Sequence, residues 1–355
     1  MAKILIKNGR VWDGENFFFS DVLSEHSIIS KIEPNVRETA DFVFDAKGKI
    51  VSSGLVDLHV HIRGISSEKF GIQAEMSCFP FGVTSAADAG GGCGSKELLD
   101  SLMLKNVVFV SVGIKNNTPD FERAERWLER YGDRAIGLKV YFDTEIEDVH
   151  DISPLQKICG YAHARNLKVM VHSSGSPVKM SEILDTLGKG DILTHSFHGG
   201  KNHAFEDGFA CIKRARARGV VIDSGFAGHV HTDFFVLKEA ISCGASPDTI
   251  STDITKFSAY TRGGRYGMTM CMNIAKTLGM REEDIFRAVT SNPAKALGKS
   301  EEWGYLQVGR CADIAVFDDT NEGFDLTDKA GNHICNKEGY RCVLTVSDGQ
   351  VVYRN

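Results

Sequence analysis

The sequence lacks several features that would place it in a special class of protein. It has no apolar run of about 18 residues, and its net charge of −6, with acidic and basic residues interspersed, gives neither the basic stripe of a nucleic-acid binder nor a polybasic membrane patch. Its amino terminus, MAKILIKNGRVWDG, has no apolar signal core. These absences predict a cytoplasmic protein with no membrane partner and no nucleic-acid partner.

Paired cysteines are also missing. The nine cysteines are scattered without a CxxC motif, and their odd number argues against a closed disulfide framework. We therefore expect reduced thiols that pack as small hydrophobic side chains, as is usual in the cytosol.

The composition is that of an ordinary globular protein, with 42% hydrophobic and 25% charged residues among 355. This length exceeds one average domain, but large single barrels also reach it. We expect one large domain with a small appendage.

The middle of the chain repeats a pattern of short apolar runs separated by helical periodicity, which is typical of βα units. Between the runs lie predicted helices over residues 119–131, 153–165 and 206–218. Eight units suffice to close a (β/α)8 TIM barrel, the predicted α/β fold class. The eight runs are 54–61, 83–90, 107–114, 135–142, 167–173, 191–197, 219–225 and 249–254.

Both ends of the chain are instead rich in short alternating strands, and neither end could bury a core alone. The simplest arrangement pairs them in one small composite β-sandwich. The predicted domains are residues 1–52 plus 300–355 for this sandwich and 53–299 for the catalytic barrel.

Candidate metal ligands recur where the predicted barrel strands end. His59 and His61 in DLHVH share one side of their strand, since side chains alternate along a strand. A single HxH pair is a weak signal, and a single buried histidine is more often a core residue. In a barrel, however, the carboxyl ends of all strands meet at one face, which would bring these six residues together: His59, His61, Lys139, His172, His195 and Asp253.

Lys139 is the unusual member, because a buried ammonium group is costly and repels cations. Reaction of its neutral amine with carbon dioxide would give a carbamate, whose two oxygens can each bind one cation. The alternative is a salt bridge to Asp143 or Asp253.

Imidazole and carboxylate ligands suit Zn²⁺, Mn²⁺ or Fe²⁺, and a site without thiolates is typical of catalytic metals. Two such ions would lower the pKa of bound water from about 15.7 to about 7 and so supply a nucleophile. Asp253 could accept its proton and pass it to the departing atom, which predicts hydrolysis.

These residues, in this order, resemble the amidohydrolase superfamily with a two-metal, carbamylated-lysine centre, and the resemblance covers nearly the whole chain. It implies that His59, His61 and Asp253 bind one metal, that His172 and His195 bind the other, and that Lys139 bridges them. The run from Ser251 to Met280 is most similar to the deacetylase-like branch near dihydroorotases. The quoted motifs are GLVDLHVH, GLKVY, MVH, LTH, STD, TSNPAKALG and GRCADIAVFD.

Candidate substrate-binding residues follow from the same resemblance. HVHIR resembles the HxHxR of dihydroorotases, in which the arginine holds a carboxylate, so Arg63 is a candidate beside the alternative of an exposed loop residue. Arg262 and Arg265 are weaker candidates for the same role, and His229 and His231 could either reach substrate from the seventh loop or be exposed to solvent.

The leading hypothesis is hydrolysis of an amide or related acyl bond in a small anionic molecule, such as an N-acyl amino acid. Cyclic amide hydrolysis, as in dihydroorotases and hydantoinases, would use the same centre. A deaminase is less favoured because of Lys139, and a non-catalytic scaffold because all six ligand positions are filled. Homo-oligomers are the default expectation for such enzymes.

Overall fold

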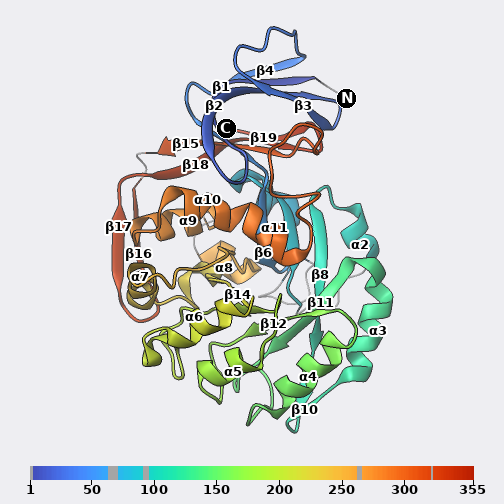
Figure 1. Ribbon diagram of the computed structural model, residues 1–355, viewed down its shortest axis with the longest axis vertical. Helices are drawn as coiled ribbons and strands as arrows, with labels where there is room; N and C mark the ends of the chain where they lie inside the picture. The colour runs from blue at the N-terminus through green and yellow to red at the C-terminus, as the bar shows by residue number, and fades with distance from the viewer. Residues whose placement is uncertain (1–2, 63–70, 91–95, 262–265, 321–322) are drawn as a thin grey trace.

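The computed structural model describes residues 3–62, 71–90, 96–261, 266–320 and 323–355, with the backbone alone at residues 229, 261 and 320. Its centre is a curled parallel sheet within a mixed α/β fold (Figure 1). In the described part of the chain this sheet has the strand order β14-β13-β12-β11-β8-β7-β6. The strands are β6 (Leu55–Val60), β7 (Val83–Asp88), β8 (Lys105–Val112), β11 (Ala135–Tyr141), β12 (Lys168–His172), β13 (Ile192–Thr194) and β14 (Val221–Ile222).

The predicted eighth strand is wrong as a strand, because residues 249–254 form none in the structure. The segment instead makes single parallel bridges to both edges of the sheet, from Ile254 to Val60 and from Thr249 to Asp223. Asp253 has a φ of 47°, which an extended ladder does not allow. Seven of the eight predicted runs therefore contain strands, and the eighth links the two edge strands.

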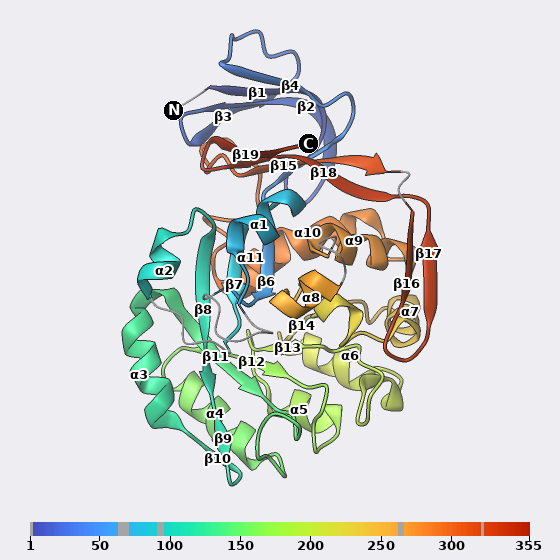
Figure 2. The same cartoon turned by 180° about the vertical axis from the view of Figure 1, so that it is seen from behind.

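Helices cover the outside of the parallel sheet (Figures 1 and 2). Asp120 caps α3 by accepting a hydrogen bond from the backbone N–H of Arg123. The predicted helix 206–218 begins later, at Ala210, because Phe209 has a φ of 63°. The helices are α1 (Ala74–Cys78), α2 (Lys96–Ser101), α3 (Phe121–Tyr131), α4 (Ser153–His163), α5 (Met180–Thr186), α6 (Ala210–Ala217), α7 (Phe234–Ser242), α8 (Lys256–Thr261), α9 (Met268–Thr277), α10 (Glu282–Val289) and α11 (Ser291–Leu297).

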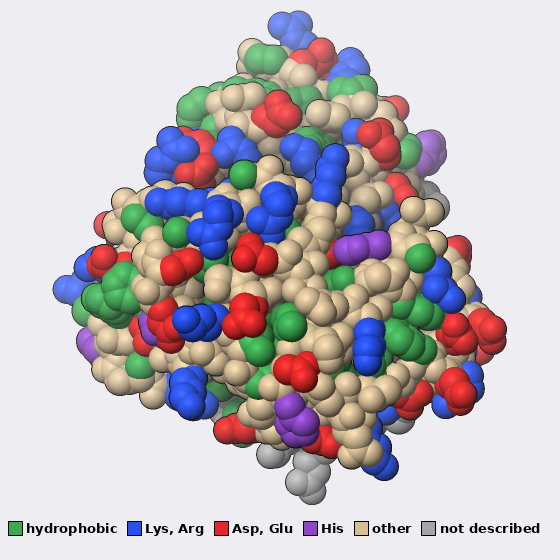
Figure 3. All heavy atoms as spheres, turned by 60° about the horizontal axis from the view of Figure 1, so that its bottom comes forward, with side chains coloured by type: hydrophobic (Ala, Val, Ile, Leu, Met, Phe, Trp, Pro, Cys, Tyr) green, Lys and Arg blue, Asp and Glu red, His purple; other side chains and the backbone are tan. Residues whose placement is uncertain are grey.

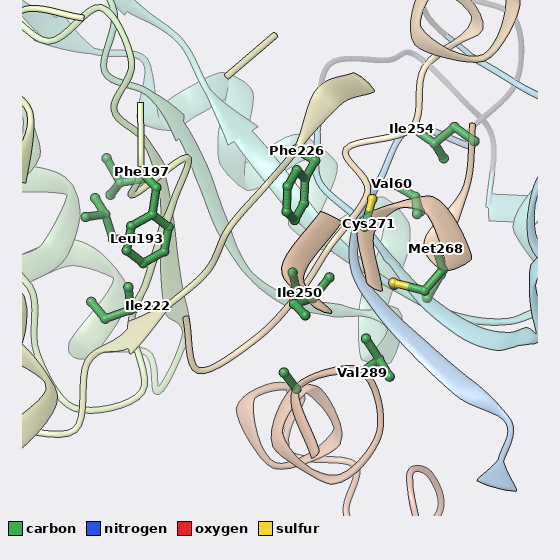
Figure 4. Close-up of a cluster of buried hydrophobic side chains, with 14 of the residues drawn as sticks. Val60, Leu193, Phe197, Ile222, Phe226, Ile250, Ile254, Met268, Cys271 and Val289 are labelled. Atoms are coloured by element: carbon green, nitrogen blue, oxygen red, sulfur yellow. The ribbon is translucent and has the colours of Figure 1, made fainter. Parts of the chain in front are cut away.

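A continuous apolar core joins the parallel sheet to its helices. Among the described residues, no helix is both long enough and apolar enough to cross a bilayer. Figure 4 shows the part of the core where strands β6, β13 and β14 meet segment 249–254 and helices α9 and α10, with Val60, Leu193, Ile222, Ile250, Ile254, Met268, Cys271 and Val289.

Strands from both ends of the chain are hydrogen-bonded into a single sheet at one end of the molecule (Figure 1). β5 links the two halves, because it pairs with β1 in parallel and with β15 in antiparallel orientation. The strand order is β19-β18-β15-β5-β1-β2-β3, with β4 also paired to β1. Their bounds are β1 (Ile4–Trp12), β2 (Phe17–Glu25), β3 (Ile28–Glu33), β4 (Phe42–Asp45), β5 (Ile50–Ser53), β15 (Ile314–Thr320), β18 (Gly339–Ser347) and β19 (Gln350–Arg354).

A hairpin that the sequence analysis did not predict leaves this terminal sheet. Its strands are β16 (Phe324–Thr327) and β17 (His333–Asn336), and it runs along the parallel-sheet part of the molecule beside α7 (Figure 2). A second short pair, β9 (Ile114–Lys115) and β10 (Thr118–Pro119), follows β8.

Candidate metal centre

The six predicted ligand residues lie together at the carboxyl ends of the parallel strands. His59 and Lys139 are within β6 and β11, His172 ends β12, and His195 follows β13 directly. All six residues are buried, with exposed fractions of 6% or less for the whole residue. Topology therefore assembles residues that are up to 194 positions apart in the chain, since Asp253 lies beside His59.

The first group consists of His59, His61 and Asp253. Asp253 Oδ1 lies 2.8 Å from His61 Nε2 and 3.2 Å from His59 Nε2. Burial alone would raise the pKa of the Asp253 carboxyl, but the neighbouring His59 and His61 imidazoles hold it below its usual range. Asp253 is therefore a carboxylate at neutral pH.

A second group contains His172, His195 and His231, whose ligand atoms lie within 4.8 Å of one another. His231 was considered only as a substrate-binding residue, but the structure places its ring 4.3 Å from that of His195, centroid to centroid. The sequence signal that could have found it is the second HxH motif, at residues 229–231.

Hydrogen bonds on the outer side of the rings turn the imidazoles toward the centre. His61 Nδ1 donates to the Gly90 carbonyl at 2.9 Å and His195 Nδ1 to the Gly225 carbonyl at 2.6 Å. Because a carbonyl only accepts, each Nδ1 carries a proton, and the Nε2 of each ring lies on the side of Asp253. This is the outer-shell arrangement that orients metal-binding histidines.

His59 is oriented through a longer chain of hydrogen bonds. The Thr194 hydroxyl donates to Asp223 Oδ2 at 2.8 Å, so its oxygen can accept from His59 Nδ1 at 3.0 Å. Asp223 also accepts from Thr249 and Ser251, which lie in the segment that bridges the sheet edges. Sequence analysis did not find this network, since threonine and serine spacing carries no specific signal.

The nitrogen and oxygen atoms that face one another in this centre test whether cations fit it. The Nε2 of His195 is buried and has no hydrogen-bond partner among the described residues. Burial lowers the pKa of His59, His172 and His195, and the charge of Lys139 lowers each of them further, so these rings are neutral at pH 7. Imidazole nitrogens and a carboxylate that lie within 4.8 Å of one another in a buried centre suit divalent cations.

Lys139 lies inside this centre, with its Nζ 3.2 Å from His59 Nε2. Burial lowers the pKa of Lys139 to about 8, although Asp253 and Asp223 raise it. Within the described residues its Nζ makes no ion pair, and Asp143 instead lies 3.1 Å from His172 Nε2. The salt-bridge alternative for Lys139 thus finds no partner within 4.0 Å among these residues.

Two of the six residues adopt backbone conformations that side chains disfavour. His195 has a φ of 60° and Asp253 a φ of 47°, both in the left-handed region. Such strain persists only where the surroundings fix it, and it clusters at functional sites.

Some predicted substrate-binding residues lie outside the described residues, namely Arg63, Arg262 and Arg265, as does the side chain of His229.

A cavity of about 310 Å³ opens beside the second group and is lined in part by His231, Asp143 and Ser174. Ser174 Oγ lies 2.8 Å from His172 Nε2 and 3.1 Å from His231 Nδ1, so it connects the histidines to the cavity wall. The outer surface carries acidic and basic side chains mixed over the face in Figure 3.

A family comparison agrees with this arrangement, because the model of the amidohydrolase family matches residues 50–352. The chain belongs to the amidohydrolase family. Members related to deacetylases are similar over most of the length: a deacetylase of Agrobacterium fabrum (strain C58 / ATCC 33970) is 30% identical over 312 residues, which cover 81% of this chain and 75% of the relative. This amidohydrolase is therefore a hydrolase that acts on carbon–nitrogen bonds.

Solved structures of enzymes with other activities have the same fold. The crystal structure of a dihydroorotase has a TM-score of 0.87 at 24% identity and covers 100% of this chain and 98% of that one. The crystal structure of an adenine deaminase has a TM-score of 0.86 at 23% identity, with 99% of each chain covered. Because the two scores are nearly equal, the fold does not select among these reactions.

Proposed function

We propose that this amidohydrolase cleaves the amide bond of a small anionic substrate, such as an N-acyl amino acid, at a two-metal centre. The observation that carries this proposal is the pair of neighbouring ligand groups, with the buried Lys139 Nζ 3.2 Å from His59 Nε2. The deacetylase relatives support the acyl substrate.

In this proposal His59, His61 and Asp253 hold one cation, and His172 and His195 hold the other. Zn²⁺ is the favoured ion, with Mn²⁺ and Fe²⁺ as alternatives. The lowered pKa of Lys139, about 8, leaves part of its amine neutral near pH 7 to 8. That neutral amine could add to carbon dioxide and lose a proton, and the resulting carbamate would supply two further oxygen ligands for the cations.

The chemistry of the cations, when bound, is to activate water and polarise the scissile carbonyl. The chain's own residues do the remaining work. Asp253 is ionised and lies at the centre, so it can accept a proton and deliver it to the departing nitrogen. The carbonyls of Gly90 and Gly225 keep the imidazoles in place during the reaction.

We also propose that the parallel sheet closes as a (β/α)8 barrel over residues 53–299, with residues 1–52 and 300–355 as the composite β domain. The single bridges from segment 249–254 to both edge strands support closure. The core shared by strands of both termini supports the composite domain.

Metal content per chain tests the centre. Elemental analysis after expression with zinc and bicarbonate should find about two ions in the wild type and far fewer in Lys139→Ala. Lys157→Ala, at an exposed position of α4, is the control and should keep its metal. Active, well-folded protein without bound metal would overturn the proposal.

Activity assays test the substrate class. Acetate release from N-acetyl amino acids should be measured in parallel with ring opening of dihydroorotate and hydantoins. We expect acyl release in the wild type and a loss of about 10³-fold in kcat for Asp253→Asn. Ring opening without acyl release would assign the cyclic amide reaction instead.

A further inference from the structure

The cavity beside the second histidine group has walls from two distant parts of the chain. One wall comes from the loops after β11 and β12, with Asp143, Glu145 and Ser174. The other includes Lys329 and Ala330, from the turn of the β16–β17 hairpin. A hairpin that leaves the terminal sheet thus contributes directly to the cavity.

Hydrogen bonds fix the hairpin turn against the amino end of α7. The Asp328 carboxylate accepts from the backbone N–H of Phe234 at 2.7 Å and from those of Ala330 and Asn332 at 2.9 and 2.8 Å. The Asn332 amide also donates to Asp233 at 3.0 Å. The backbone of Lys329 is therefore held in one place relative to the cavity.

The acidic groups nearest this turn already have partners. Asp233 accepts from the backbone N–H groups of Phe235 and Val236 at the start of α7, and Asp143 contacts His172. By contrast, within the described residues neither Lys329 nor Glu145 makes an ion pair, and both side chains are exposed. Lys329 is the one lysine or arginine among the described residues that line the cavity.

His198 and Thr232 add uncharged polar groups to the cavity wall. His198 Nδ1 accepts from the Gly200 N–H, so the ring proton is on Nε2. Burial lowers the pKa of His198 to about 3, which keeps the ring neutral. Among the described residues, its Nε2 and the hydroxyl of Thr232 have no hydrogen-bond partner, although both side chains are buried. A polar wall of this kind suits a hydrophilic ligand.

We propose that Lys329 is a specificity residue that binds the carboxylate of the substrate at this cavity, opposite the amide to be cleaved. The inference rests on the proposed amide hydrolysis, since it places the reacting bond at the histidines and the anionic group at the hairpin. An ammonium group on a fixed turn gives a charge-assisted hydrogen bond to a carboxylate and no comparable contact with a neutral amide.

The test compares N-acetylalanine, in both enantiomers, with the neutral N-acetylalaninamide in the metal-loaded enzyme. Lys329→Glu should lower kcat/KM for the acid at least tenfold and leave the value for the carboxamide within about twofold. Glu145→Gln, which removes a negative charge from the cavity wall, should instead raise kcat/KM for the acid. Lys337→Glu, directly after the same hairpin and outside the cavity lining, is the matched control, and its kcat/KM values should equal those of the wild type.

Calorimetric binding of N-acetylalanine separates this inference from the proposed function. If the wild type hydrolyses neither compound, the amide-hydrolase proposal fails, while weaker binding of the acid to Lys329→Glu still supports the anion site. Equal losses for acid and carboxamide, an unchanged preference in Lys329→Glu, or no binding of the acid by the wild type would overturn the role of Lys329.

Discussion

At the scale of single residues, two glycine carbonyls orient histidines of the candidate centre. Gly225 is the tighter case, because its φ of 54° is left-handed and its carbonyl accepts from His195 Nδ1 at 2.6 Å. A Cβ at this position would lie 2.5 Å from that nitrogen and would also meet Thr194. Only glycine fits both the backbone and the space.

We therefore expect Gly225→Ala to weaken metal affinity by about 10–100-fold, because the ring it holds must move. Gly190→Ala is the control, since Gly190 has a φ of 86° but nothing within 4 Å of an added Cβ. That variant should lose about 1 kcal/mol of stability from backbone strain and keep its metal. Competition with a chelator measures the affinity. Equal metal affinities in the two variants would contradict the argument.

At the scale of elements, Asp223 joins parts of the sheet that backbone pairing links only weakly. It follows β14, and its carboxylate accepts from Thr194, the last residue of β13, and from Thr249 and Ser251 in the bridging segment. Burial raises the pKa of Asp223 to about 6, although the three hydroxyl groups lower it. The folded chain thus keeps this proton over a pH range in which the unfolded chain releases it.

The stability contributed by this raised pKa is fully present below about pH 4 and is lost as the pH rises to about 6, a change of about 3 kcal/mol. In Asp223→Asn this part of the pH dependence should be absent. Urea unfolding between pH 4.5 and 7.5 measures it, with the exposed Asp133→Asn as the control. Parallel stability curves for wild type and Asp223→Asn would refute the assignment.

At the scale of the whole molecule, the two ends of the chain stabilise each other. Ile4, Ile6 and Val22 from the amino end pack with Ile314, Leu344 and other apolar residues of the carboxyl end in one buried cluster. The terminal sheet also adds Trp12 and Phe317 to the main core. We therefore expect the chain to unfold as one unit.

Leu344→Ala should lower the free energy of unfolding by about 2–5 kcal/mol, because Leu344 is completely buried and its truncation leaves a cavity. Val351→Ala, on the neighbouring β19 and 38% exposed, should change it by less than about 0.5 kcal/mol. Fluorescence and circular dichroism should report the same midpoint in each protein. Two separate transitions would show that the terminal sheet unfolds by itself.

Metal removal should also act on the whole molecule. A cation that binds only the folded chain stabilises it by about 4 kcal/mol at a free concentration a thousand times its Kd. Chelation should therefore lower the Tm of the wild type and leave that of Lys139→Ala nearly unchanged. The same decrease in both proteins would point to an effect unrelated to this centre.

Much of this architecture could be predicted because it depends on local patterns. Apolar runs mark the parallel strands, and the alternating strands at both termini mark the second sheet, since periodicity records which face is buried. Strand ends in a parallel fold meet at one edge, so the sequence also indicated that His59, Lys139, His172 and Asp253 would be neighbours.

The sequence by itself determined the order in which the candidate ligands follow successive strands, the chemical types of these ligands, and the family that the chain resembles. Only the tertiary structure decided that 249–254 bridges instead of forming a strand, that His231 joins His172 and His195, and that the 324–336 hairpin reaches the cavity. Each of these depends on contacts between residues far apart in the chain, such as Asp328 with Phe234, and on backbone angles such as the φ of Asp253. Local periodicity contains no information about such contacts, because they arise only when separate elements pack together.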